Sequence, residues 1–468
     1  MSCVVLLFIE RFLYTKFIDD VGEPPEFTQE FLAQLIHLCR ALAQFEEVLS
    51  GLDRNMQLAA AQERQIDIAS ALACHAEDIL HHVRCKDVIG FLRIFSSNEE
   101  TIVKRGVLHL HTVVFVLFAQ FPPTLGKMDL SDEFLAEMRR EVFEGREGYM
   151  NVGEAPGITP ARNEHVTDPK NGELDMLFLF DHVGIDQEGS KWKTVPFEVK
   201  NLRARLADQQ EAVKNAGWAS LFFCNHDQPR VVSRWGNDAD RESRELSAKA
   251  FGMLLHMHRG TPYIYEGEEL GMTNAHFTTL EQYRDLESIN GYRQRVEEAK
   301  CQSAESMMDA LALIGRDNAR TPMQWDASKY AGFTAPDAAT EPWIGVNPNH
   351  VEINAAEEFD DPDSVYGFYK KLIAMRHNSA TVATGAWNLL AADDEQVYAF
   401  TRTSGDDTIL VVVNLTDRSA GLPGEVAELL GDGVAESQIL LSTYDVAHGV
   451  KSIARGELAR WEGVVIQL

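Results

Sequence analysis

Short apolar segments that end abruptly in polar residues alternate with helical patterns through the middle of this chain. In the clearest of them, an apolar run from Leu221 stops at Asn225, and Pro229 then prevents a regular continuation. A buried strand whose carboxyl end delivers polar side chains into a cleft has this form. Similar segments occupy 148–157, 175–182 and 261–269, and the stretches between them predict helices at 131–143, 198–215 and 241–258. This alternation favours an α/β fold, either a (β/α)8 barrel or a doubly wound sheet.

The two ends of the chain carry different patterns. Residues 1–105 contain apolar stripes at helical spacing, which predict a helical region of unknown type. Residues 106–118 are rich in β-branched and aromatic residues, as a buried strand would be. Beyond residue 386 several strand patterns follow one another without long helices between them, so 386–468 is expected to be a separate antiparallel domain, a β-sandwich.

Within the middle region, Ser131 suits the N-cap of the first predicted helix, because acidic residues follow it in the first turn. Residues 282–345 show little periodicity and are expected to form long loops with short helices. The segment 364–378 predicts an amphipathic helix.

Charge and cysteine usage narrow the class of protein. A formal net charge of −29 opposes binding to nucleic acid or to an anionic membrane, since both require basic surfaces. No apolar run approaches the ~18 residues that a membrane span needs, and the N-terminal apolar run lacks the features of a signal peptide. The six cysteines show no disulfide framework. We therefore expect a cytoplasmic protein with free thiols.

A cluster of potential zinc ligands lies in the N-terminal region, between Cys74 and Cys85. It contains His75, His81 and His82 as well. The spacing fits no zinc motif. We expect a helix with polar and core-facing histidines, and no metal.

Two carboxylates occupy the ends of predicted parallel strands, Glu154 and Asp227. Barrel enzymes build their active sites at that edge. Two carboxylates that face one cleft are what glycosidic cleavage needs, because one protonates the leaving oxygen and another attacks or stabilises the sugar cation. His226 could donate a hydrogen bond beside them. The alternative is that each carboxylate caps or salt-bridges a strand end, and residue type alone leaves this alternative ahead.

Four longer motifs resemble glycoside hydrolase family 13, the α-amylase family. They lie at 152–157, 225–238, 260–274 and 316–326, and the resemblance extends from about residue 129 to the end of the chain. The pattern is most similar to that of oligo-1,6-glucosidases, α-glucosidases and trehalose-6-phosphate hydrolases. It implies that 106–385 forms the C-terminal half of a (β/α)8 TIM-type barrel.

The resemblance also implies roles for individual residues. Glu154 matches the general acid/base at the end of the fifth barrel strand. Asp227 matches the carboxylate that holds sugar hydroxyls and stabilises the transition state, and His226 matches its neighbouring hydrogen-bond donor. Either Arg316 or Arg320 is similar to a sugar-pocket arginine. The carboxylates of 266–269 are expected to brace the rim through arginine pairing.

One expected residue is missing from the sequence. The family uses an aspartate nucleophile at the end of the fourth strand, in a Gly-Phe-Arg-x-Asp type motif. When this motif is laid on Gly106, His111 takes the arginine position and Val113 the aspartate position. Valine cannot form a glycosyl-enzyme ester, and no Asp or Glu occurs between Glu100 and Asp129. The first three strands of the family are not recognisable in 1–105.

The expected function is that of an α-glucosidase-type hydrolase acting on short α-glucosides, α-1,4 or α-1,6, with a retaining mechanism by resemblance. Its partner would be an oligosaccharide or disaccharide substrate, and no cofactor is expected. A non-catalytic carbohydrate-binding protein and a trehalose-6-phosphate hydrolase are the alternatives. An N-terminal fusion or frame disruption, a pseudoenzyme or an unusual arrangement could each explain the missing nucleophile, and the first is favoured because the pocket motifs are intact.

Overall fold

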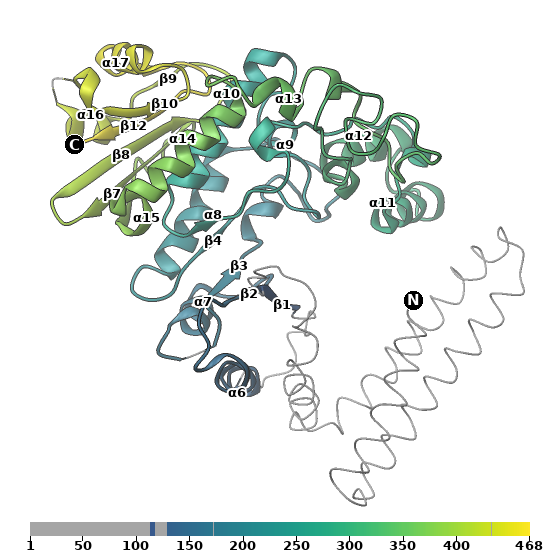
Figure 1. Cartoon of the computed structure of the whole chain (residues 1–468), viewed down its shortest axis with the longest axis horizontal. Coiled ribbons are helices and arrows are strands. Elements are labelled where there is room, and N and C mark those ends of the chain that lie inside the picture. The colour runs from purple at the N-terminus through teal and green to yellow at the C-terminus, as the bar shows by residue number, and fades with distance from the viewer. Residues whose placement is uncertain (1–112, 118–128, 172, 432) are drawn as a thin grey trace, which may run out of the picture. The chain divides into compact units, whose positions relative to one another are not determined.

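Parallel strands organise the first part of the computed structural model, which describes residues 113–117, 129–171, 173–431 and 433–468 (Figure 1). The first three strands form one sheet in the order β1-β2-β3, and a parallel bridge between Leu177 and Ala219 leads on to a second pair, β4-β5. The strands are β1 (Val113–Leu117), β2 (Met150–Glu154), β3 (Met176–Phe178), β4 (Ser220–Leu221) and β5 (Thr261–Pro262). The expected strands are confirmed, although β4 and β5 are shorter than the apolar runs that predicted them.

The register of this sheet fixes which residues lie at its carboxyl edge. Leu117 pairs with Glu154, and Glu154 pairs with Phe178. Val113 pairs with Met150 at the opposite end of β1. The position at which the nucleophile was expected is therefore at the amino end of the strand, away from Glu154.

Helices connect these strands, and the predicted helices are confirmed as α6 (Asp129–Met138), which continues as a π-helical turn at Arg139–Phe143, α8 (Val199–Ala212), α10 (Arg241–Met257) and α14 (Val365–Asn378). The shorter helices α7 (Pro160–Thr167) and α9 (Val231–Arg234) were not predicted. The expected N-cap at Ser131 is wrong, because the helix already begins at Asp129. Serine costs only a few tenths of a kcal/mol inside a helix, so it does not force a start.

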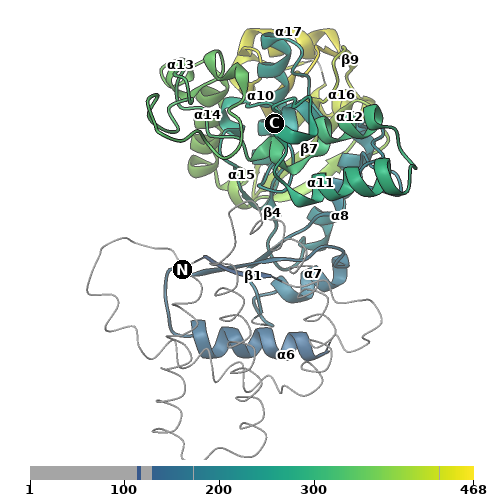
Figure 2. The same ribbon diagram turned by 90° about the vertical axis from the view of Figure 1, so that its right-hand side faces the viewer.

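The helix α6 belongs to a small core of its own beside the β1-β2-β3 sheet (Figure 2). Leu135 of α6 packs with Val166 of α7 and with Leu177 of β3. The region expected to be helical over 1–105, with its Cys74–Cys85 cluster, lies outside the described residues.

The segment after β5 forms the expected long loops with short helices. A 3₁₀ turn at Glu268–Leu270 lies between two glycines in the left-handed region, Gly267 and Gly271. Further along lie α11 (Leu286–Tyr292), α12 (Ala304–Ile314) and a 3₁₀ turn at Arg316–Ala319. A separate core around Tyr283, Leu311 and Ile314 holds these helices together.

The C-terminal part contains a five-stranded antiparallel sheet in the order β10-β12-β8-β7-β6 (Figure 1). A two-stranded sheet, β11-β9, adds to it, so the region expected to be a β-sandwich has one large sheet and one small sheet. The strands are β6 (Ala386–Leu390), β7 (Val397–Ser404), β8 (Asp407–Asn414), β9 (Ala420–Gly421), β10 (Ile439–Ser442), β11 (Glu457–Leu458) and β12 (Gly463–Gln467).

The two faces of the large sheet pack on different partners, because alternate side chains of a strand point to opposite sides. Phe400 and Val411 belong to the core that contains residues of α10 and α14. Ala399 and Val412 belong to a second core with residues of α16 (Gly424–Leu430) and α17 (Val446–Arg455). The helices between these strands are short, with 7 residues in α16 and 10 in α17.

Buried arginines tie the two parts together. Arg203 of α8 donates to the carbonyl oxygens of Ala392 and Val397, and Arg402 of β7 donates to that of Met257 at the end of α10.

None of the described helices combines the length and the apolar character needed to cross a bilayer.

Candidate active site

The segment that follows β4 turns sharply and presents Asp227. The Asn225 side chain accepts the backbone N–H of Asp227 at 2.7 Å, which is the geometry of an Asx turn. The backbone N–H of Arg230 donates to Asn274 at 2.9 Å and fixes the end of the turn. The sequence predicted that a strand carries these polar side chains. In the structure a loop carries them, since only Ser220 and Leu221 are paired as a strand.

A buried histidine supports the start of this loop. The His182 ring contacts the carbonyl oxygen of Phe222 at 2.9 Å through Nε2. Burial lowers the pKa of His182 to about 4, so the ring is neutral near pH 7. A carbonyl oxygen only accepts, so Nε2 carries the proton and donates it. Although 175–182 was expected to be one strand, Asp181 and His182 lie in a 3₁₀ turn after β3.

Both candidate arginines contact the carboxylate of Asp227. Arg320 Nη2 lies 2.5 Å from Asp227 Oδ1, and Arg316 Nη1 lies 3.5 Å from the same oxygen. Arg320 also donates from Nε to the carbonyl oxygen of His226 at 2.7 Å. The His226 ring lies 3.7 Å from Asp227 Oδ2 and is largely exposed. The structure thus brings four of the five predicted site residues together.

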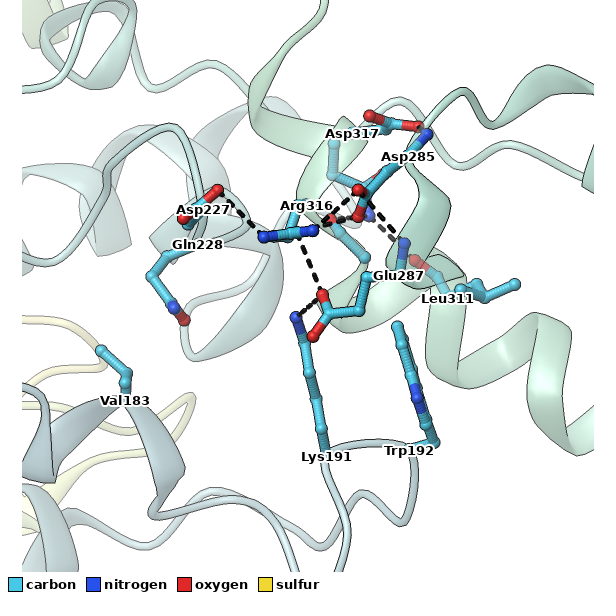
Figure 3. Close-up of polar contacts among 12 residues, drawn as sticks. Val183, Lys191, Trp192, Asp227, Gln228, Asp285, Glu287, Leu311, Arg316 and Asp317 are labelled. Atoms are coloured by element: carbon cyan, nitrogen blue, oxygen red, sulfur yellow. Dashed lines mark hydrogen bonds and ion pairs between the residues drawn. The ribbon is translucent and has the colours of Figure 1, made fainter. Parts of the chain in front are cut away.

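The position of Arg316 is set by a second carboxylate (Figure 3). Asp285 accepts two hydrogen bonds from Arg316, from Nε and from Nη2, each at 2.8 Å. The Asp285 side chain is only 5% exposed. Burial alone would raise the pKa of Asp285, but the hydrogen bonds and charge of Arg316 outweigh it and hold this pKa below its usual value. Asp285 therefore stays ionised and holds the guanidinium in place.

Further charges extend this network. Glu287 Oε2 lies 3.0 Å from Arg316 Nε, and Lys191 donates to the same oxygen at 2.5 Å. Burial lowers the pKa of Lys191, while its hydrogen bond to Glu287 opposes that shift. Asp317 is fully buried and accepts the backbone N–H groups of Arg284 and Asp285. These bonds fix the loop from which Asp285 projects.

The arrangement can hold a polyhydroxyl ligand. The Asp227 side chain is 39% exposed although two guanidinium groups touch it. A carboxylate accepts hydrogen bonds at two oxygens, and guanidinium groups present several donors in a fixed plane. Sugar hydroxyls can donate to the first and accept from the second.

Glu154 lies at the carboxyl end of β2 and is half-buried. Within the described part of the chain, its carboxylate makes no hydrogen bond and no ion pair. Among the described residues, Glu154 therefore has no partner that would compete with a ligand.

The carboxyl end of β1 supplies no carboxylate. Leu117 is the residue in register with Glu154, and residues 101–128 contain neither Asp nor Glu. This conclusion holds for any register of the family motif on this strand.

The carboxylates after β5 have other partners than those expected. Arg230 donates to the carbonyl oxygen of Glu266 at 2.5 Å, so the expected arginine pairing involves the backbone and not a carboxylate. Glu268 accepts from Tyr369 Oη at 3.1 Å, and burial raises the pKa of Glu268 to about 7. Glu269 accepts from the backbone N–H of Gly267 at 2.8 Å. Among the described residues, no cluster of three or more His, Cys, Asp or Glu side chains could hold a metal ion.

Asp285, Glu287 and Lys191 were not predicted from the sequence. They follow no apolar run, and Asp285 and Glu287 lie at the start of the short helix α11, where periodicity gives no signal. Only the bidentate contact with Arg316 identifies Asp285.

Successive parallel strands with helices between them, and charged side chains gathered at their carboxyl edge, are typical of α/β enzymes. A family model described as "Alpha amylase, catalytic domain" matches residues 126–385, and one described as "Maltogenic Amylase, C-terminal domain" matches residues 388–436. The chain belongs to the α-amylase family.

Individual relatives support this assignment. The chain is 42% identical over 341 residues to an oligo-1,6-glucosidase of Parageobacillus thermoglucosidasius. The matched region covers 72% of this chain and 58% of that protein. It is 39% identical over 340 residues to a trehalose-6-phosphate hydrolase of Bacillus subtilis, with the same two coverages. A solved structure of trehalose-6-phosphate hydrolase from Bacillus licheniformis superimposes with a TM-score of 0.64 at 39% identity, covering 72% of this chain and 59% of that one. The chain thus spans little more than half the length of the relatives it matches.

Proposed function

We propose that the chain recognises short α-glucosides, α-1,4 or α-1,6 linked, in the Asp227 pocket and is an α-glucosidase-type glycoside hydrolase. The observation that carries this proposal is the exposed Asp227 carboxylate held by Arg316 and Arg320. The relatives named as oligo-1,6-glucosidase and trehalose-6-phosphate hydrolase support the ligand class. We further propose that 106–385 is the C-terminal half of a (β/α)8 barrel and that the protein acts in the cytoplasm.

In this proposal Glu154 is the general acid/base. It protonates the glycosidic oxygen as the bond to the anomeric carbon breaks, and Asp227 binds the hydroxyls of the same sugar ring and stabilises its developing positive charge. A retaining mechanism also needs a carboxylate that attacks the anomeric carbon. Because β1 supplies none, we expect hydrolysis by this chain to depend on a carboxylate provided from outside.

Added formate tests this proposal. Its oxygen forms a bond to the anomeric carbon while the bond to the leaving group breaks, and water then hydrolyses the glucosyl formate. We expect glucose release from isomaltose and maltose to rise with formate concentration. The Glu154→Gln variant should lose most of this activity on isomaltose, whose leaving alcohol must be protonated, but less on p-nitrophenyl α-glucoside, whose leaving group needs little protonation.

Glu147→Gln is the matched control, because Glu147 is exposed and lies outside β2. If Glu154→Gln and Glu147→Gln reduce isomaltose hydrolysis equally, Glu154 is not the acid.

The missing carboxylate favours a second candidate, a carbohydrate-binding protein without catalysis. In that case formate releases no glucose from either disaccharide, while maltose still raises the melting temperature and Asp227→Asn reduces this effect. A trehalose-6-phosphate hydrolase would instead act on trehalose 6-phosphate and not on isomaltose under the same conditions.

A further inference from the structure

A cavity of about 440 Å³ lies between α8, the end of α9 and the connection from β8 to β9. It is lined by 197–200, 234–236 and 415–418, together with Glu395 and Trp461. None of the residues of the Asp227 pocket lines it. Its volume falls within the range of about 300–1,000 Å³ that small-molecule sites occupy, and such sites favour the junctions between structural layers and domains.

Aromatic rings contribute part of its wall. The Phe197 ring stacks on the Trp235 ring with centroids 5.6 Å apart and an interplanar angle of 20°. Trp461 lies on the wall as well and packs against Phe251, with ring centroids 6.1 Å apart. Phe197 is half-buried, whereas the two tryptophans are buried, so Phe197 is the ring most open to a ligand. Flat apolar rings of this kind accept the C–H face of a pyranose.

Charges of both signs surround the rings. The lining contains the carboxylates of Glu198, Glu395 and Asp417 and the cations of Lys200, Arg234 and Arg418. Because Asp186 already pairs with Arg234, the lining leaves three carboxylates and two cations to face a ligand. A hydroxyl group both donates and accepts, so it can use both kinds of side chain.

Two of the charged groups are available to a ligand. The Glu395 and Arg418 side chains form no hydrogen bond or ion pair with other described residues. The remaining charges are partly engaged, since Lys200 lies 3.3 Å from Glu198 and Asp417 lies 3.9 Å from Arg460.

Arg234 links this cavity to the loop that carries Asp227. Its guanidinium is held by Asp186 through two hydrogen bonds of 2.7 Å. From Nη1 it donates to Gln228 Oε1 at 2.8 Å, and Gln228 directly follows Asp227. The cavity therefore adjoins the Asp227 pocket without being part of it.

We propose that this cavity is a second binding site for a neutral oligosaccharide, stacked on Phe197 and hydrogen-bonded by Glu395 and Arg418. The choice of ligand rests on the proposed function, because the same α-glucosides would occupy both sites.

Thermal shifts with maltose test this proposal on the full chain. A ligand raises the melting temperature through each site that it occupies in the folded state. We expect Asp227→Asn to remove only part of the maltose effect and the pair Glu395→Ala/Arg418→Ala to weaken the remainder at least tenfold in apparent affinity. The control pair Asp406→Ala/Arg455→Ala removes one charge of each sign from exposed positions away from the cavity and should leave the effect unchanged.

Two outcomes would overturn the second site. In one, Asp227→Asn alone abolishes the maltose effect, and in the other the cavity pair behaves like the control pair. Neither outcome affects formate-dependent hydrolysis through Glu154. Conversely, if formate produces no hydrolysis, maltose still raises the melting temperature of the Asp227→Asn variant through the second site. The two proposals therefore fail separately.

Discussion

The ion pair between Asp186 and Arg234 connects stability to the site, and replacing Asp186 with Asn tests this connection. Both side chains are only 2% exposed. Asp186 accepts two hydrogen bonds from Arg234 and a third from Trp235 Nε1 at 2.9 Å. Asn has nearly the same size, so the substitution removes the charge with little change in packing and leaves a buried guanidinium without its counter-ion.

The expected magnitude follows from this burial. Removal of one partner of a buried pair costs about 3–5 kcal/mol, because the other charge stays out of water unpaired. An exposed pair of similar chemistry provides the control. Lys214 lies 3.2 Å from Glu211, and both side chains are more than half exposed. Glu211→Gln should therefore cost less than about 1 kcal/mol.

Urea unfolding of the two variants measures the difference. We expect Asp186→Asn to lower the midpoint by about 1–2 M and Glu211→Gln to lower it by a few tenths. Because Arg234 also holds Gln228 beside Asp227, Asp186→Asn should weaken the binding of maltose as well. Equal midpoint shifts in the two variants would refute the argument from burial. A full loss of stability without any loss of maltose affinity in the remaining folded protein would refute the connection to the site.

Three further predictions concern the pocket and the packing around it. Asp227→Asn should weaken maltose binding in its pocket by about 10- to 100-fold, because hydrogen bonds to a charged group contribute about 1.5–3 kcal/mol. An unchanged affinity in calorimetric titration would contradict this prediction. Glu268 has its pKa raised from 4.5 to about 7, so the folded state binds its proton more tightly and stability falls as the pH rises through this interval. Glu268→Gln should then gain up to about 3 kcal/mol relative to the parent chain between pH 5 and pH 8, and parallel pH curves of the two midpoints would exclude this. Gly252→Val should destabilise by about 1–3 kcal/mol, because a Cβ at Gly252 in α10 would lie 2.7 Å from the Tyr369 ring of α14; unchanged thermal unfolding would show that the ring moves aside at no cost.

The sequence predicted the long helices and missed a short helix that lies among strands. The helices α8, α10 and α14 carry apolar stripes long enough to be recognised, and their predicted ranges agree with the structure within a few residues. The strand end at Glu154 was predicted because an apolar run meets a carboxylate there. By contrast, α17 was missed although its apolar residues keep helical spacing, because it has only 10 residues and lies among strands.

The pocket was only partly predictable for a different reason. Asp227, Arg316 and Arg320 belong to continuous motifs, so sequence comparison found them. Asp285 acts on Arg316 from a position 31 residues away, within loops that have no regular period. Such a contact depends on how two loops meet, and no local pattern encodes it. The absent carboxylate on β1 could be read directly from the composition of 101–128.

The core that contains residues of α8, α10 and α14 also contains residues of β7, β8 and β12. Family comparison places a boundary near residue 386, but apolar side chains cross it continuously, and Arg203 and Arg402 anchor each side to the other. The boundary therefore separates two family models and not two independent cores. A cut there would expose Phe251 and Met253 on one fragment and Phe400 and Val411 on the other, so neither piece would remain soluble alone. Any engineering of this chain has to keep the large sheet packed against α10 and α14.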